Sequence, residues 1–483
     1  MFQPFIKNTG TFRKPLKRLE DSLRALIPRL KPGVNEKLDI ARGSEASRTF
    51  VGGSEVRSFL GVLVVLLATA FCVRAQQPLA PWLNETERAH FESLRKSGLE
   101  ALYNIDYDKA YRDFKEIVQL YPNHPGGHQL LAARLWIKTL YESRRLQSSL
   151  YNSESFYTNG DDPVDPKVVD EFRGLTREAK RLAEARLKQD PKSIEALDFL
   201  ANTEGLKAAF EEAVERRHFA ALRDGNDAVE HHRAVMKIDP TYIDAQITIG
   251  LYEYVVGSLP LPIKVVAGAT GYRGSKKKGL AMLEQVAKEG HWAQDDAKTV
   301  LVLLYTREKR FNDVLTITRE LSAKYPRNYL LRLETADALV SIAAQKRKAN
   351  DAAGAVQAEK EAFATFDELL HDRNARDAAT NAMDLIHFKY GEVLSTAGQN
   401  DRAAKEFLAA TKQDHAEPGL VTMAHLYAAR AYDVSGRRDE ALVQYKEVLA
   451  RPNVYDAHDE AKKGLKQVYK PEQFAQKEVE QYK

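Results

Sequence analysis

From about residue 85 to the C-terminus, apolar residues recur three or four positions apart. That is the period of one face of an α-helix, so the pattern predicts helices throughout this part of the chain. Proline lacks a backbone N–H and ends the helix before it. Four dipeptides thus mark helix ends: Tyr121-Pro122, Asp190-Pro191, Asp239-Pro240 and Tyr325-Pro326.

The predicted helices carry an internal repeat. In the first copy, Gly98 is followed by Ala110, Phe114, Ile117 and Pro122. The pattern recurs at Gly391, Gly398, Ala403, Phe407 and Ala410, and again at Ala429, Gly436, Ala441, Tyr445 and Val448. A degenerate copy contains Phe311, Val314, Leu321 and Pro326, and the segments Ala179–Pro191 and Ala228–Pro240 have the spacing of second helices. We expect the small residues to let two helices approach closely, and Phe114, Phe407 and Tyr445 to fill the gap to the next pair.

This pattern resembles the tetratricopeptide repeat (TPR) family, most clearly at 91–124 and 384–452 and less so at 295–328. The resemblance implies an all-α fold, a right-handed α-solenoid of TPR-like helical hairpins over 84–483. Loop insertions are expected near 151–166 and 257–278. One hairpin cannot bury its apolar face alone, so neighbours must stack and form a concave wall.

In the family, the first helix of each pair lines that wall. Carried over by position, the resemblance implies partner contacts at Arg95, Leu99, Tyr103, Thr306, Arg307, Phe388, Glu392, Met423, Leu426 and Arg430. Some family members clamp a terminal carboxylate with a Lys/Asn set on these helices. Here Arg95 and Leu99 occupy two such places, so the asparagine is missing and that activity is not implied.

The N-terminal part differs in composition. Residues 59–73 (FLGVLVVLLATAFCV) form an uncharged run, too short for a spanning helix of about 20 residues but typical of a signal-peptide core. We expect 58–75 to be a signal peptide cleaved before Gln76, so that the protein is exported to the periplasm or cell envelope. A short membrane anchor at 59–73 is the alternative. Residues 1–57 are expected to be a non-structural extension, or to precede a true start of translation near Val56.

Removal of this part changes the charge. Residues 1–75 hold 13 Lys and Arg against 6 Asp and Glu, whereas the remainder holds 59 against 62. The expected mature chain is therefore mildly acidic, which argues against nucleic acid as a partner. Its lone cysteine, Cys72, lies in the apolar run, so 76–483 has no thiol chemistry.

The remaining candidate chemistry is weak. The adjacent His231 and His232 point about 100° apart on a helix and do not readily share a metal ion. The charged run Glu211-Glu212 to Glu215-Arg216-Arg217 is typical of a solvated helix face. No arrangement of residues identifies a nucleophile or an acid–base pair, so we expect no catalytic residues, metal or cofactor.

The segment 257–278 (GSLPLPIKVVAGATGYRGSKKK) is the one stretch that the repeat does not explain. Its glycines fit neither standard phosphate-loop spacing. Apolar residues beside Lys276, Lys277 and Lys278 suit contact with a membrane surface, and a loop packed inside the superhelix is the other interpretation. The segment is also locally similar to eukaryotic inclusion-body-clearance repeat proteins, some of which associate with mitochondrial outer membranes.

Together these features predict a non-catalytic scaffold or adaptor that binds a protein or peptide in the cell envelope through its concave face. The alternatives are a peripheral membrane-associated assembly factor that uses 257–278 and, third, an envelope enzyme.

Overall fold

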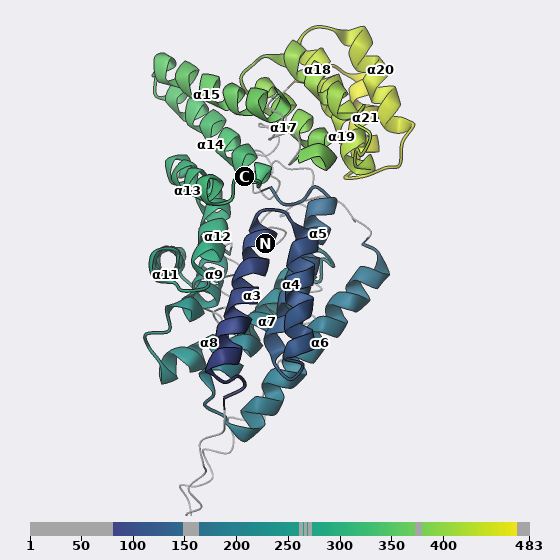
Figure 1. Cartoon of the computed structure of the whole chain (residues 1–483). Helices are drawn as coiled ribbons and strands as arrows, with labels where there is room; N and C mark the ends of the chain where they lie inside the picture. The colour runs from purple at the N-terminus through teal and green to yellow at the C-terminus, as the bar shows by residue number, and fades with distance from the viewer. Residues whose placement is uncertain are drawn as a thin grey trace, which may run out of the picture. The chain divides into compact units, whose positions relative to one another are not determined.

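Successive helices pair as antiparallel hairpins along the whole described chain (Figure 1). The computed structural model describes residues 81–147, 164–259, 264, 268, 273–371 and 379–470, and these contain no strand. From Trp82 onward they belong to one unit. The pairs are α3 (Glu85–Tyr103) with α4 (Tyr107–Leu120), α5 (Pro125–Glu142) with α6 (Pro166–Gln189), α7 (Ile194–Ala213) with α8 (His218–Ile238), α9 (Gln246–Gly257) with α11 (Lys276–Glu289), α12 (Gln294–Arg307) with α13 (Phe311–Lys324), α14 (Tyr329–Lys348) with α15 (Ala352–His371), α17 (Met383–Thr396) with α18 (Asn400–Ala410), and α19 (Pro418–Val434) with α20 (Arg438–Leu449).

Three shorter elements complete the order. The 3-10 turns η5 (Ile243–Ala245) and η6 (Thr380–Ala382) precede α9 and α17, and α21 (Ala457–Lys466) follows the last pair. Of the predicted parts, residues 1–57, the segment 58–75, most of the stretch 151–166 and half of the stretch 257–278 lie outside the described residues. Within the described part of the chain, no helix combines the length and apolar character needed to cross a membrane.

Helix boundaries follow the local sequence. The predicted stops are confirmed, since α4, α6, α8 and α13 each end two residues before one of the four prolines. At the other end, the side chain of Asn84 accepts from the backbone N–H of Glu87, whose carboxylate accepts from the Asn84 N–H in return. This capping box satisfies two donors that α3 would otherwise leave unpaired.

Left-handed residues follow the first helices of most pairs. The residues and φ angles are Ile105 (63°), Arg144 (58°), Arg216 (55°), Lys309 (58°), Asn350 (61°), Gly398 (78°) and Gly436 (76°). Only glycine adopts this conformation without a steric penalty. The repeat thus imposes one turn geometry on several side chains that disfavour it.

The small positions of the repeat do what the sequence predicted. A Cβ atom on Gly98 would lie 2.2 Å from Phe114 Cε1, and one on Gly391 would lie 2.6 Å from Phe407 Cε1. Each ring therefore packs on a glycine of its own pair. Phe407 also reaches Tyr427 on the next pair, with 5.6 Å between ring centroids.

The hairpin α9/α11 uses glycines in another way. A Cβ atom on Gly279 would lie 2.5 Å from the carbonyl oxygen of Gly250, so the two backbones touch. Helix α11 begins at Lys276, because Ser275 caps it by accepting from the Lys278 N–H.

Contacts also join hairpins that are distant in the chain. The guanidinium of Arg144, at the end of α5, lies against the carboxylate of Asp384 on α17, with Nε 3.1 Å from Oδ1. At the end of α3, the ring of Tyr103 stacks on Tyr325 at 4.8 Å, and its carbonyl accepts from Asn328 Nδ2 at 2.7 Å. Early and late repeats thus contact each other within this unit.

Candidate functional site

A cavity of about 450 Å³ opens among the first helices of several pairs. Its wall comes from the middle of α3, the start of α7, residues 241–244 at η5, and residues 289–292 between α11 and α12. Cavities of this size take a small ligand or a few side chains. We call this space the α3 cavity.

The lining of the α3 cavity is mostly acidic at neutral pH. It contains two arginines, Arg88 and Arg95, and five carboxylates: Glu92, Glu195, Asp198, Asp244 and Glu289. Aromatic rings of Phe91, Phe199, Tyr242 and Trp292 lie between them.

Arg95 is the residue of the predicted binding set that lies in this lining. Its guanidinium carbon is 4.1 Å from the centre of the Trp292 ring, a cation–π contact. Within the described chain, Nε of Arg95 is buried and has no hydrogen-bond partner. Burial lowers the pKa of Arg95, while the nearby carboxylates of Asp198 and Asp244 act in the opposite direction. The guanidinium is thus held by a ring and by the negative field around it.

Two of the carboxylates hold the cavity wall together. Asp244 accepts from the backbone N–H groups of His291 and Trp292, both at 2.8 Å, and so fixes the turn that carries the indole ring. Asp198 accepts from Asn202 Nδ2 at 3.0 Å, and its other oxygen lies 3.2 Å from His232 Nε2. The fully buried His232 therefore contacts a carboxylate of the wall.

A third carboxylate neutralises the second arginine. Glu195 lies 3.3 Å from Nη1 of Arg88 and 3.5 Å from Nε2 of the buried His124. Burial acts to raise the pKa of Glu195, but the contacts with His124 and Arg88 outweigh it, so the pKa is lowered.

Glu92 differs from these three. Its half-buried side chain faces the cavity from α3, one turn before Arg95, and the described part of the chain offers it no hydrogen bond or ion pair. Glu92 and Arg95 are therefore the charged groups of this wall that a ligand could engage without first breaking an ion pair or a hydrogen bond of the described chain.

The structure places the other predicted contact residues differently. Phe388, Met423 and Leu426 are 0 %, 2 % and 1 % exposed, so they pack in the core and present no surface to a partner. Their position on first helices suggested binding, but neighbouring pairs cover that face. Glu392 pairs with Lys389 at 2.6 Å, and Arg430 pairs with Glu460 at 3.0 Å.

The remaining predicted residues are half-buried. Tyr103 donates to Asp296, and Leu99 packs beside the core of the first pairs. On α12, Thr306 donates to the Val302 carbonyl at 2.8 Å, and the Arg307 guanidinium lies 5.9 Å from the Tyr254 ring. None of these four lines the α3 cavity.

Apart from Arg95, the residues of the cavity wall were not predicted from the sequence; four of them are Asp198, Tyr242, Asp244 and Trp292. Asp198 lies on a first helix whose repeat pattern is weak, and the others lie at or near connections between helices. The dipeptide Asp239-Pro240 could have indicated Tyr242 and Asp244, because in the repeat a first helix starts just after such a proline.

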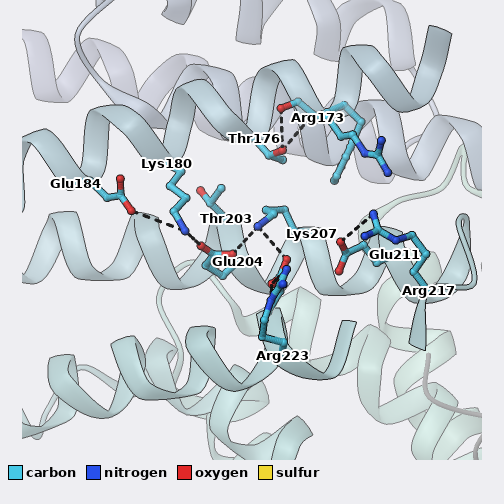
Figure 2. A network of polar contacts seen from close by, with 12 residues as sticks. Arg173, Thr176, Lys180, Glu184, Thr203, Glu204, Lys207, Glu211, Arg217 and Arg223 are labelled. Carbon is cyan, nitrogen blue, oxygen red and sulfur yellow. Dashed lines mark hydrogen bonds and ion pairs between the residues drawn. The ribbon is translucent and has the colours of Figure 1, made fainter. Parts of the chain in front are cut away.

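A second polar cluster links α6, α7 and α8 (Figure 2). Lys207 Nζ lies 2.9 Å from Glu204 and 2.8 Å from Asp224, and both carboxylates are buried. Lys180 and Arg223 extend the chain of ion pairs on either side. Basic and acidic side chains alternate along this network, so its ion pairs connect the three helices.

The prediction of a solvated face at 211–217 is wrong for its first residues, whereas Arg217 is exposed. Glu211 and Glu212 are 7 % and 3 % exposed, because neighbouring helices cover this side of α7. Burial, followed by the charge of Asp224, raises the pKa of Glu211 to about 7, although Arg217 lies 3.6 Å away.

Two of the three lysines at the end of the 257–278 segment also form ion pairs. Lys278 Nζ lies 2.7 Å from Glu253, and Lys276 pairs with Glu308. These carboxylates offset the cost of cations at a helix N-terminus. Half of the segment lies outside the described residues, and its contact with a membrane stays a prediction.

The described residues contain no group of three His, Cys, Asp or Glu side chains arranged to hold a metal ion. In the α3 cavity, Asp244, Glu195 and Asp198 are instead occupied by backbone N–H groups, arginine or histidine.

The same architecture is indicated by the paired helices, the glycine–aromatic contacts and the recurrent turn. The fold is a TPR-like α-solenoid. Comparison with solved structures finds several such proteins. Human IFIT1, solved as a dimer with PPP-AAAA, is 14% identical over 77% of this chain and 80% of its own, with a TM-score of 0.40. A thermophilic TPR protein of Thermus thermophilus is 21% identical over 43% of this chain and 98% of its own, with a TM-score of 0.31.

Yeast Tom70 is 12% identical over 78% of this chain and 88% of its own, with a TM-score of 0.32. Likeness at these identities concerns the fold and carries no argument on function. No protein-family model and no curated protein matches the sequence.

Proposed function

We propose that this protein is a non-catalytic scaffold of the cell envelope, and that it binds a protein or peptide partner in the α3 cavity. The observation that carries the proposal is a cavity on first helices whose wall presents Glu92 and Arg95 without ion-pair partners in the described chain. Its volume suits a short segment of a partner rather than a folded domain. The surplus of carboxylates disfavours nucleic acid, whose phosphates would be repelled.

Photo-crosslinking in the native host tests the proposal. A photoreactive amino acid is placed at Glu92, inside the cavity, and in a matched variant at Glu116, which is exposed on α4 of the same hairpin. We expect position 92 to crosslink one partner that position 116 does not capture. Equal patterns from the two positions would contradict a binding role for the cavity.

The envelope location rests on the apolar run at 59–73 and needs its own test. N-terminal sequencing of the native protein is expected to begin at Gln76. Recovery of residues from 1–57 would contradict export with cleavage.

A further inference from the structure

The α3 cavity already holds one cation, which indicates the chemistry it favours. The Arg95 guanidinium lies over the Trp292 ring at 4.1 Å, and its buried Nε has no hydrogen-bond partner in the described chain. A guanidinium is stable in such a place only where the surrounding potential is negative, because its desolvation is costly. The carboxylates of the wall thus favour positive charge and offset part of the desolvation that lowers the pKa of Arg95.

The balance of charges supports the same conclusion. Arg88 pairs with Glu195, and Glu289 lies 3.8 Å from Lys288, which leaves Arg95 as the other cation of the wall beside Glu92, Asp198 and Asp244. The hydrogen bonds to Asp198 and Asp244 orient these groups but do not remove their negative charge. An anionic ligand would be attracted to Arg95 but repelled by the surrounding carboxylates.

Glu92 supplies the anchoring group. Its carboxylate faces the cavity, and no cation of the described chain pairs with it. The aromatic rings of Tyr242 and Trp292 lie in the same wall, and such rings attract guanidinium and ammonium groups.

We infer that the α3 cavity binds a basic segment of its partner, in which an arginine or lysine side chain pairs with the Glu92 carboxylate. The inference rests on the proposed function and adds the chemical class of the partner. An acidic segment that binds Arg95 instead is the competing outcome.

Three acetylated and amidated hexapeptides test this: glycine alternating with arginine, with lysine or with glutamate. Binding to the full chain is measured by calorimetry and by the fluorescence of its tryptophans. The arginine and lysine peptides are expected to bind, and the glutamate peptide is expected not to. Glu92→Gln should weaken the basic peptides about fivefold, since an ion pair in a partly buried site contributes about 1 kcal/mol.

The matched control is Glu116→Gln, which removes the same charge from an exposed position of α4. It should leave the affinity unchanged, and circular dichroism confirms that both variants fold. Equal effects of the two variants, failure of the basic peptides to bind, or stronger binding of the glutamate peptide would overturn the inference. A specific crosslink at position 92 together with any of these results would leave the proposed function standing and remove only the basic segment.

Discussion

The contact between Arg144 and Asp384 offers a quantitative test of how the hairpins are joined. Both side chains are buried, at 6 % and 1 % exposure, and they lie 240 residues apart in the sequence. Arg144 Nε donates to both carboxylate oxygens, at 3.1 and 3.2 Å, while its Nη2 donates to the carbonyls of Asn381 and His415. Asp384 also accepts from the backbone N–H of Glu417 at 2.9 Å.

Arg144→Ala would leave the Asp384 carboxylate buried without its cation. Removal of one partner of a buried pair costs about 3–5 kcal/mol. The same position has a left-handed φ of 58°, so Arg144→Gly should be less destabilising than Arg144→Ala by about 1 kcal/mol. The control is Arg181→Ala, because Arg181 pairs with Glu178 on the exposed side of α6, and this substitution should change the stability far less.

Urea denaturation followed by circular dichroism measures the free energies of unfolding. Since repeat proteins need not unfold in one step, hydrogen exchange of the α17 amides is measured in parallel. Arg144→Ala should accelerate exchange in α17 as well as in α5. A loss no larger than that of Arg181→Ala, or unchanged exchange in α17, would refute the structural role of this contact.

Three further changes test other parts of the structure. The pKa of Glu211 is raised to about 7 from 4.5, so the folded state binds more protons in this window and stability falls as pH rises through it. Glu211→Gln should therefore stabilise the protein by up to about 3 kcal/mol at pH 8 and hardly at all at pH 4, as urea titrations would show; a pH-independent effect would contradict this. Gly98→Ala should lower the free energy of unfolding by about 1–3 kcal/mol because the new methyl group would meet the Phe114 ring. Gly174→Ala, which has nothing within 4 Å, should instead raise Tm. Equal shifts in Tm for the two variants would be inconsistent with the close packing at Gly98. Lys309→Gly should stabilise by up to about 1 kcal/mol in urea denaturation by relieving its left-handed turn, and a loss of stability would disprove that strain.

The sequence alone was sufficient to predict much of the fold. The spacing from Gly98 to Phe114 and from Gly391 to Phe407 reflects a contact that admits only a small residue, so it is visible in any single copy. The prolines fixed where α4 and α13 end. The sequence did not predict the left-handed turns. Glycine occupies them only at Gly398 and Gly436 among the turns between paired helices of the described chain, and other residues occupy the rest.

The site was less predictable. The repeat pattern selected Arg95, which lines the α3 cavity. The same pattern also selected Phe388 and Met423, which the next helix pairs cover. The repeat pattern predicts which face of a helix points inward. It does not predict how much of that face the neighbouring helices leave exposed. Asp244 and Trp292 belong to connections, where no period applies, and only the folded chain brings them beside α3.

The most direct test of the central claim measures the affinity of the crosslinked partner for two charge-reversal variants of the purified protein. Glu92→Arg places a cation inside the α3 cavity, and Glu116→Arg places the same cation on the outer helix of the same hairpin. We predict that the dissociation constant rises at least about tenfold for Glu92→Arg and stays unchanged for Glu116→Arg, with similar Tm values. Equal affinities in the two variants would contradict the assignment of the cavity as the binding site.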